Sequence, residues 1–226
     1  MIAFPQANIF SVETIETGLP FNENGYYKLE HYTPFFYEDD DYIVTSECHG
    51  EFGGKVRFKN KKDNTVTVAY AACPVIINKI GSKYLLTTSL AHMMGFYSFF
   101  EIDDPRELTV EIQDSTYHSE SELSSGMKLL TSGMGKTILL SFPYKSQIYH
   151  VVSDHENKEC YIALRENATL KKIQQLSKLQ MQAFSIDACV TKDGHYATLF
   201  SIRENNRLRG GYIDVFENAI KIYLCK

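Results

Sequence analysis

Strand–turn–strand units recur along this chain, and they constrain its fold more than any other feature. Four units are clearest, each joining two apolar or alternating segments through a short polar turn: 55–70, 74–88, 148–164 and 189–201. The last one turns at Lys192-Asp193-Gly194, and Asp-Gly is a strong hairpin signal because glycine adopts positive φ angles without steric cost. In the first, Val56 and Phe58 alternate with polar residues, so that hairpin has one apolar face. The units predict an all-β protein.

A faint internal repeat links several of these strands. Tyr42-Ile43-Val44-Thr45-Ser46 resembles Tyr84-Leu85-Leu86-Thr87-Thr88, and weaker echoes begin at positions 128, 161 and 196. The spacing gives each echo roughly 35–45 residues, which is enough for the four short strands of a propeller blade. We therefore expect residues 1–226 to form a single, five-bladed β-propeller-like domain. A β-sandwich or barrel is the alternative, since its strands also recur at short intervals.

Two further segments bear on this architecture. The N-terminal residues 1–30 are expected to complete the last blade by pairing with the C-terminal strand at 213–224, which would cover exposed sheet edges. Residues 167–181 contain apolar side chains at every third position, a spacing that fits a short amphipathic helix as well as a strand and loop.

Net charge and cysteine spacing limit the kinds of partner and the cellular location that we expect for this chain. The net charge of -5 argues against a nucleic-acid partner or an anionic membrane surface, and no apolar run is long enough for a membrane span. The five cysteines show no CxxC spacing, so we expect reduced thiols. With no secretory signal in the first ten residues, the expected location is the cytoplasm. A secreted or periplasmic location is the alternative if a leader has been removed.

The Tyr-apolar-apolar-Thr-Ser echoes resemble the blades of small five-bladed β-propellers, a class that includes furanosidase-type enzymes and lectin-like sugar-binding proteins. The resemblance is architectural and covers the chain from about Tyr32 onwards. It implies a ligand site in a central funnel, where the furanosidase-type enzymes carry three acidic residues. No motif around an Asp or Glu of this chain matches those residues, so no catalytic residue is carried over. The chain also has no Trp, the residue that commonly stacks on sugars.

Histidine marks the candidate site. His49 and His92 fall within one position of each other when the first two echoes are aligned, and Glu47 and Glu51 flank the first of them. Equivalent positions on adjacent blades lie close together, so we expect the two imidazoles and a carboxylate to form a binding site. Such a group could hold a divalent metal or share a proton. The alternative is that each histidine caps the end of its strand.

Other motifs are interpreted structurally. Ser132-Gly133-Met134-Gly135-Lys136-Thr137 lacks the first glycine of a phosphate loop and precedes a strand-like segment, so we expect a turn. The acidic run 38–41 and the segment Asp154-His155-Glu156 are expected to be solvated turns.

No nucleophile, complete metal site or cofactor fingerprint is evident, so catalytic residues and a cofactor stay unassigned. The sequence favours a binding or interaction module for a small molecule, glycan or protein. The alternative is a hydrolase, glycosidase-like or metal-dependent, with its active site in the central funnel.

Overall fold

The computed structural model of the chain describes residues 8–18, 36–111, 125–183, 188–191, 193–204 and 207–225. Most of these residues lie in β-strands, and the helical elements among them are two short 3-10 turns, η1 (Gly50–Phe52) and η2 (Pro105–Glu107). The all-β prediction is confirmed. Within this described part, no helix has the length and apolar character needed to cross a membrane.

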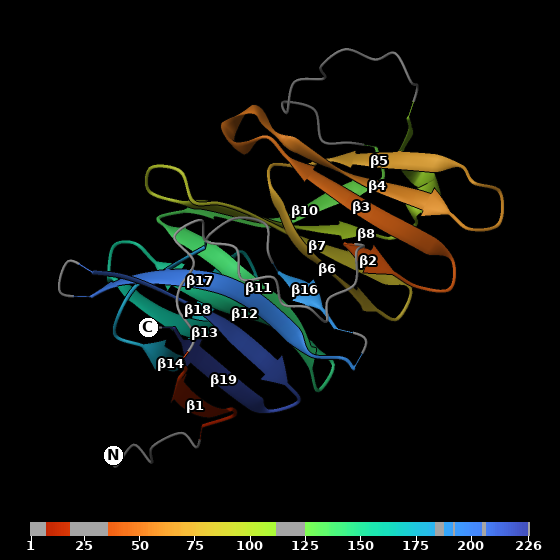
Figure 1. The fold of residues 1–226 in the computed structure, drawn as a ribbon. Coiled ribbons are helices and arrows are strands. Elements are labelled where there is room, and N and C mark those ends of the chain that lie inside the picture. The colour runs from red at the N-terminus through yellow and green to blue at the C-terminus, as the bar shows by residue number, and fades with distance from the viewer. Residues whose placement is uncertain are drawn as a thin grey trace, which may run out of the picture.

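The described strands form four sheets, and none of them closes on itself (Figure 1). The first sheet has the order β2 (Tyr37–Glu38), β3 (Tyr42–Cys48), β4 (Gly54–Asn60), β5 (Val66–Tyr70), β9 (Thr109–Val110). The second has the order β10 (Met127–Met134), β8 (Phe96–Ile102), β7 (Lys83–Leu90), β6 (Pro74–Ile80).

The third and fourth sheets complete the molecule. The third has the order β11 (Lys136–Tyr144), β12 (Gln147–Asp154), β13 (Glu159–Glu166), β14 (Thr169–Ser177). The fourth has the order β1 (Ser11–Glu16), β19 (Ala219–Leu224), β18 (Arg207–Phe216), β17 (Tyr196–Glu204), β15 (Met181–Ala183), with β16 (Cys189–Val190) also paired to β17. Figure 1 shows the orange strands of the first sheet at the upper right and the blue strands of the fourth at the lower left.

Each sheet is built mainly from strands that follow one another along the chain. The four predicted hairpins are present as β4–β5, β6–β7, β12–β13 and β16–β17, all antiparallel. The five echoes are distributed unevenly over the sheets. Those at 42, 84, 161 and 196 lie on β3, β7, β13 and β17, whereas the echo at 128 lies on β10, the edge strand of the second sheet. Two of the five similar strands, β7 and β10, therefore lie in the same sheet, and the described sheets number four.

The N-terminal segment pairs with the C-terminal strand. Strand β1 runs parallel to β19, in register from Ser11 opposite Ala219 to Glu16 opposite Leu224. Phe10, just before β1, is buried, and the Gln174 amide brackets its backbone: Phe10 N donates to Oε1 at 3.0 Å, and Nε2 donates to the Phe10 carbonyl at 2.8 Å. Residues 1–7 and 19–30 of the predicted closing segment lie outside the described residues.

The helix alternative for residues 167–181 is wrong, because 169–177 form strand β14. Two bulges in the β13–β14 ladder explain the misleading spacing. Tyr161 pairs with Gln175 and Cys160 with Ser177, so Leu176 is an extra residue between them. In the same way, Ile173 is the extra residue between the pairs Ala163–Lys172 and Ile162–Gln174. A bulge adds one residue to an otherwise alternating strand, so apolar side chains recur at intervals of three.

Three apolar clusters hold the sheets together. The largest joins the second, third and fourth sheets, with Ile76, Leu140 and Phe200 at its centre. Another joins the first and second sheets through Phe58, Tyr84 and neighbouring residues. The smallest lies between the second and third sheets. The second sheet therefore contributes to all three clusters, and its strand ends lie where the other sheets meet.

Candidate functional site

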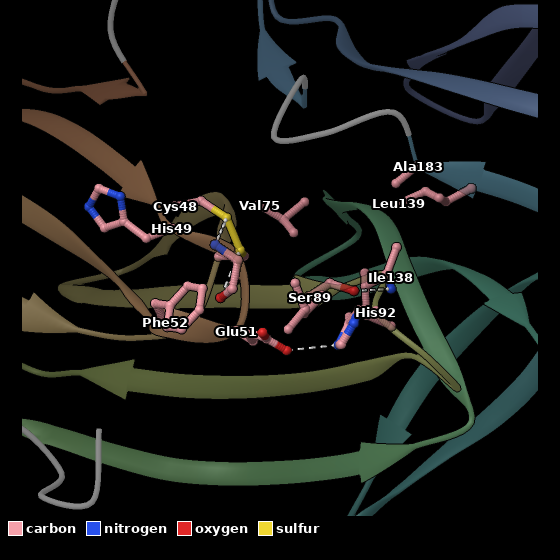
Figure 2. A pocket seen from close by; sticks show the side chains of 14 residues that line it. Cys48, His49, Glu51, Phe52, Val75, Ser89, His92, Ile138, Leu139 and Ala183 are labelled. Carbon is pink, nitrogen blue, oxygen red and sulfur yellow. Dashed lines mark hydrogen bonds and ion pairs between the residues drawn. A yellow bond between two sulfur atoms is a disulfide. The ribbon is translucent and has the colours of Figure 1, made fainter. Parts of the chain in front are cut away.

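A cavity of about 420 Å³ lies where strand ends from all four sheets meet (Figure 2). The first sheet supplies the end of β3 and η1, the second supplies the start of β6 and the end of β7, the third supplies β11, and the fourth supplies β15. The lining residues are Cys48, His49, Gly50, Glu51, Phe52, Cys73, Val75, Ser89, Leu90, Ala91, His92, Ile138, Leu139 and Ala183. We call this space the sheet-end cavity.

The walls of the sheet-end cavity are mostly apolar. Val75, Ile138 and Leu139 are buried side chains that form part of it, while Phe52 at its rim is 68% exposed. Met93 and Met94, which follow the lining residue His92, are also largely exposed, at 87% and 61%. Unbranched methionine side chains adapt to irregular apolar shapes. Neither methionine lines the cavity, so its described lining combines a buried apolar floor with the exposed Phe52 ring at the rim.

His92 and Glu51 form an ion pair at the cavity. His92 Nδ1 lies 3.2 Å from Glu51 Oε2, and each side chain is 55% exposed. The pair joins the end of β7 in the second sheet to η1 in the first (Figure 2). Exposed ion pairs contribute little to stability, so this contact should add little to the stability of the fold.

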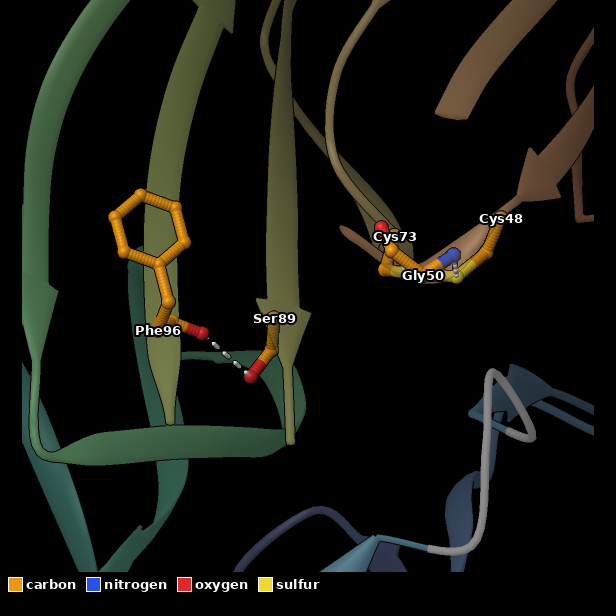
Figure 3. The surroundings of a disulfide bond; sticks show 5 residues. All are labelled: Cys48, Gly50, Cys73, Ser89 and Phe96. Atoms are coloured by element: carbon orange, nitrogen blue, oxygen red, sulfur yellow. Dashed lines mark hydrogen bonds between the residues drawn. A yellow bond between two sulfur atoms is a disulfide. The ribbon is translucent and has the colours of Figure 1, made fainter. Parts of the chain in front are cut away.

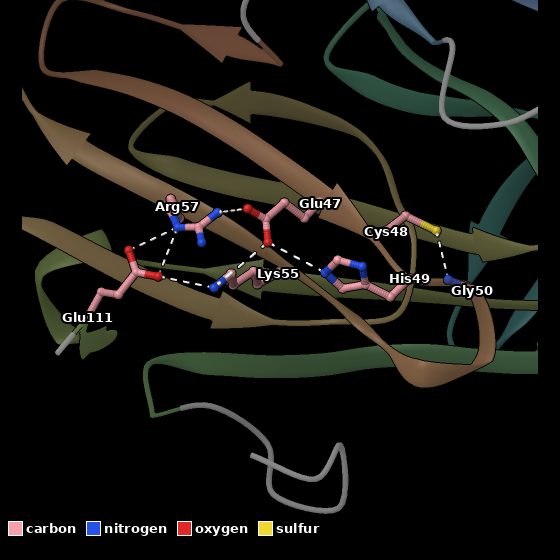
Figure 4. A network of polar contacts seen from close by, with 7 residues as sticks. All are labelled: Glu47, Cys48, His49, Gly50, Lys55, Arg57 and Glu111. Carbon is pink, nitrogen blue, oxygen red and sulfur yellow. Dashed lines mark hydrogen bonds and ion pairs between the residues drawn. The ribbon is translucent and has the colours of Figure 1, made fainter. Parts of the chain in front are cut away.

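His49 is held by a different carboxylate. Its Nε2 lies 3.6 Å from Glu47 Oε2, and Glu47 also accepts a hydrogen bond from Arg57 (Figure 4). That hydrogen bond outweighs burial and lowers the pKa of Glu47. Glu47 does not line the cavity, and in Figure 2 the His49 ring points away from His92. The four predicted site residues therefore form two separate His–Glu pairs, and only the His92–Glu51 pair lies wholly at the cavity.

An ion network fixes Glu47 on the first sheet. Glu111 follows β9 and accepts hydrogen bonds from Arg57 Nε at 2.9 Å and from Lys55 Nζ at 3.2 Å (Figure 4). Burial alone would raise the pKa of Glu111, but the hydrogen bonds and charges of Arg57 and Lys55 outweigh it. The net pKa is lowered, so the carboxylate stays ionised. Since every charge in this network has an opposite partner, it serves to order the sheet edge.

A disulfide forms part of the cavity wall and corrects the expectation of reduced thiols. Cys48, at the end of β3, is bonded to Cys73, just before β6 (Figure 3). Their sequence separation of 25 residues matches no short cysteine motif, so the spacing gave no signal. Cys160 and Cys225 are buried and outside any disulfide, while Cys189 is half-buried and its Sγ donates to the Ala197 carbonyl at 3.8 Å.

The glycines near His49 have structural roles as well. Gly50 and Gly53 have φ angles of 66° and 96° in the turn around η1, a conformation that favours glycine. A Cβ on Gly54 would lie 2.4 Å from the Glu47 carbonyl and 2.8 Å from that of Ala71. Gly54 therefore lets neighbouring strands approach each other, and only Gly50 of the three lines the cavity.

Ser89 connects the cavity wall across sheets. Its Oγ accepts a hydrogen bond from the Ile138 backbone at 2.8 Å (Figure 2) and donates one to the Phe96 carbonyl at 3.3 Å (Figure 3). Its backbone N–H donates to the Cys73 carbonyl. These bonds join β7 to β8, to β11 and to the disulfide. The hydroxyl thus holds these strands together at the cavity wall.

Three other sequence interpretations can be compared with the structure. Gly135, with φ of 80°, forms the turn between β10 and β11, so the segment 132–137 is a strand connection as expected. Asp154 Oδ1 accepts hydrogen bonds from the backbone of Glu156 and Asn157 within a turn, but its side chain is buried beside Lys136.

The expectation of a solvated acidic run is wrong for Asp39, which is 13% exposed and contacts Lys79 Nζ and Tyr84 OH at 2.6 Å.

A further histidine–carboxylate pair, His195 and Asp214, was not predicted from the sequence. His195 Nδ1 lies 2.8 Å from Asp214 Oδ1, and the His195 ring stacks on Phe216. The two residues are 19 positions apart and meet only because β17 pairs with β18. They do not line the sheet-end cavity.

The described residues contain no group of three or more His, Cys, Asp or Glu arranged to hold a metal ion. The chemistry that the sheet-end cavity can provide is apolar contact, one ion pair and the His49 ring. None of the protein-family models compared with the chain matches it, and no curated protein matches it either.

Proposed function

We propose that the chain is a binding module that takes a small, largely apolar ligand into the sheet-end cavity. The observation that carries this proposal is a cavity of about 420 Å³ with apolar walls and a single His–Glu pair. Ligand sites are typically clefts of about 300–1,000 Å³ with apolar walls and a few placed polar groups. The ligand would carry one hydrogen-bonding group, which the His92–Glu51 pair would contact.

The lining favours this ligand over the alternatives. A glycan would need many hydrogen-bonding side chains, whereas the described lining offers His49, Glu51, Ser89 and His92, and the Ser89 hydroxyl already makes two hydrogen bonds. Glycoside hydrolysis needs two carboxylates that flank one bond, and Glu51 is the single carboxylate among the described lining residues. Binding is therefore better supported than hydrolysis.

We further infer that the four sheets are blade-like units of one domain arranged around this cavity. Two features support a propeller-like arrangement: each sheet consists mainly of consecutive antiparallel strands, and every sheet contributes a strand end to the cavity. The described strands form four sheets, whereas the repeat predicted five blades. A β-sandwich is the alternative, with the cavity then at the end of the packed layers.

The Cys48–Cys73 disulfide supports a secreted or periplasmic location over the cytoplasm, because disulfides persist in oxidising compartments. Mass spectrometry of the protein isolated under alkylating conditions would test this. Two alkylated residues at Cys48 and Cys73 would contradict it.

The binding proposal is tested by titration with N-phenyl-1-naphthylamine, a neutral apolar probe with one N–H group and fluorescence that rises in apolar surroundings. Ala91 lines the cavity and is exposed, so Ala91→Trp should fill the space without disturbing the core. We expect this variant to bind the probe at least about tenfold more weakly, a difference of about 1.4 kcal/mol.

The matched control is Ala168→Trp, which adds the same side chain to an exposed turn away from the cavity. It should bind the probe as the wild type does. Equal affinity of wild type and Ala91→Trp, or no binding to either, would contradict the proposal.

A further inference from the structure

A second cavity, of about 230 Å³, lies between the second and third sheets. It shares no lining residue with the sheet-end cavity. Its apolar wall includes Leu85, Phe99 and Leu164, and its polar groups include His150 and Arg165. We call it the intersheet cavity. Its size suits a ligand smaller than the one proposed for the sheet-end cavity.

His150 and Thr87 are the buried polar residues among the described lining of the intersheet cavity, and His150 is the titratable one. Its side chain belongs to β12, and the residue is 4% exposed. The ring is held from two directions: Nδ1 lies 2.8 Å from Ser141 Oγ, and the ring centroid lies 4.2 Å from that of Phe99. These contacts fix the orientation of the imidazole before any ligand arrives.

The hydrogen-bond chain behind His150 determines which nitrogen carries the proton. Ser141 Oγ lies 3.0 Å from Thr87 Oγ1 and 2.8 Å from His150 Nδ1, and when Thr87 donates to Ser141, the Ser141 hydroxyl proton is left for Nδ1. Burial, assisted by the charge of Arg165, lowers the pKa of His150 to about 3, so the ring is neutral at physiological pH. A neutral ring that accepts at Nδ1 carries its proton at Nε2. The described residues show no hydrogen bond to Nε2, and Nε2 is not among their fully buried unpaired atoms, so this nitrogen is open to the cavity.

Arg165 adds a positive charge at the same cavity. It is exposed, and one guanidinium nitrogen, Nη1, donates to the Asn167 carbonyl at 3.0 Å. The guanidinium group has five N–H donors, so several stay available for a ligand. No Asp or Glu is among the described lining residues, so nothing there neutralises this charge.

We propose that the intersheet cavity is a second binding site, which takes a small carboxylate with an apolar tail. The carboxylate would accept hydrogen bonds from His150 Nε2–H and from Arg165, and the tail would contact Leu85, Phe99 and Leu164. A charged acceptor is favoured because the imidazole N–H and the guanidinium are both donors, and hydrogen bonds to a charged acceptor are stronger than those to a neutral one. This site is independent of the function proposed for the sheet-end cavity.

The Ser141–His150 pair is not a nucleophile with its base. Ser141 is fully buried and does not line the intersheet cavity, so no substrate atom can reach its hydroxyl. His150 also has no carboxylate on its ring among the described residues, whereas a catalytic histidine is usually oriented by a third group. The geometry supports binding without covalent chemistry.

The test is titration of the full chain with benzoate, followed by NMR of the ¹⁵N-labelled histidine rings. We expect saturable binding, with the largest shift at the His150 Nε2–H signal. Benzamide, which has the same ring without the charge, should bind at least about tenfold more weakly. Arg165→Leu should weaken benzoate binding by a similar factor, and because Arg165 is exposed this variant should fold normally. Arg203→Leu is the matched control, since Arg203 is exposed but does not line the cavity.

Several results would overturn the proposal. One is the absence of a benzoate-dependent shift at His150. Others are equal benzoate affinity in Arg165→Leu and Arg203→Leu, and equal binding of benzoate and benzamide. Stronger binding of inorganic phosphate than of benzoate would overturn the assignment to an apolar carboxylate. Failure of Ala91→Trp to affect N-phenyl-1-naphthylamine would bear on the sheet-end cavity alone.

Discussion

The two cavities hold their histidines in opposite ways. In the sheet-end cavity, His92 is paired with Glu51 at a solvated rim where both side chains are 55% exposed. In the intersheet cavity, His150 is buried, hydrogen-bonded to Ser141 and packed on Phe99. Water screens the first arrangement and leaves its side chains free to adjust. The second is fixed, because a buried polar group that loses its partner is costly.

This difference shows how one all-β scaffold can provide two kinds of recognition. The sheet-end cavity depends on a covalent bond for its shape, since Cys48 and Cys73 form part of its wall. The intersheet cavity depends on hydrogen bonds between hydroxyl groups and an imidazole. Perturbing each kind of support separately should therefore affect the two cavities unequally.

The largest expected effect is on the disulfide. Replacing Cys48 and Cys73 together by Ala should lower the free energy of unfolding by about 3 kcal/mol, because the closed loop of 25 residues no longer restricts the unfolded chain. Chemical denaturation measures this. Cys189→Ala, which removes a half-buried thiol that is not disulfide-bonded, is the control and should change stability less. A double variant as stable as the wild type would show that the disulfide does not support the sheet-end cavity.

The next effect concerns pH and belongs to the intersheet cavity. The pKa of His150 is lowered from 6.5 to about 3 by burial and by Arg165, so below pH 6.5 the unfolded chain binds more protons than the folded one. Stability is therefore highest above pH 6.5 and decreases as the pH falls. Between pH 6.5 and 5 this one residue should reduce the free energy of unfolding by about 2 kcal/mol.

The comparison for this pH effect is His150→Gln, measured by denaturation at several pH values. The variant should lose less stability than the wild type over that interval. Parallel pH curves for the two proteins would mean that His150 is protonated as readily in the folded state as in the unfolded chain.

A smaller effect is expected from the hydroxyl behind His150. Ser141→Ala removes the donor to Nδ1 and should destabilise the fold by about 1–2 kcal/mol. It should also weaken benzoate binding, because the ring can then carry its proton on either nitrogen. Calorimetry and the histidine ring spectra would report both changes. Unaltered ring signals in the variant would contradict the proposed proton arrangement.

The smallest effect is expected at the solvated pair. A double-mutant cycle on Glu51→Gln and His92→Gln should give a coupling energy below about 1 kcal/mol, and it should fall further as salt is added. A coupling of several kcal/mol, unaffected by salt, would mean that the two cavities are held alike, and the contrast between them would be lost.

The sequence allowed the hairpins to be predicted but not the number of sheets. Local turn chemistry defined β6–β7 and β16–β17, whereas the echo at 128 belongs to a strand that pairs with β8 instead of starting a new sheet. Similar strand sequences do not determine which neighbour each strand bonds to. The β14 spacing was ambiguous for a related reason, because its bulges appear only once β13 is beside it.

The candidate site could be predicted in part. The alignment of the echoes predicted that His49, His92 and Glu51 lie close together, and all three line one cavity. It did not predict that the two histidines pair with different carboxylates. Ile138 and Leu139 carried no signal, because a lining aliphatic residue looks like any core residue in sequence. The disulfide partners were too far apart in the chain to be matched.

The contact between Ser141 and His150 was not predicted from the sequence. They face each other in the β11–β12 ladder, and the register of a hairpin is set by its turn. Lys145 and Ser146 both have positive φ angles, 47° and 62°, as in a type I′ turn. Neither is the Asn or Gly that marks such turns in sequence, so the register and the pair it creates were not evident.

The claim that the sheet-end cavity binds a small apolar ligand is tested most directly by methyl NMR. Protein labelled at Ile, Leu and Val methyl groups would be titrated with N-phenyl-1-naphthylamine. We predict shifts at Val75, Leu90, Ile138 and Leu139, which line the cavity, and none at Ile162 or Ile213 in the core. Shifts confined to methyl groups outside the cavity, or no shifts at saturating probe, would contradict the account.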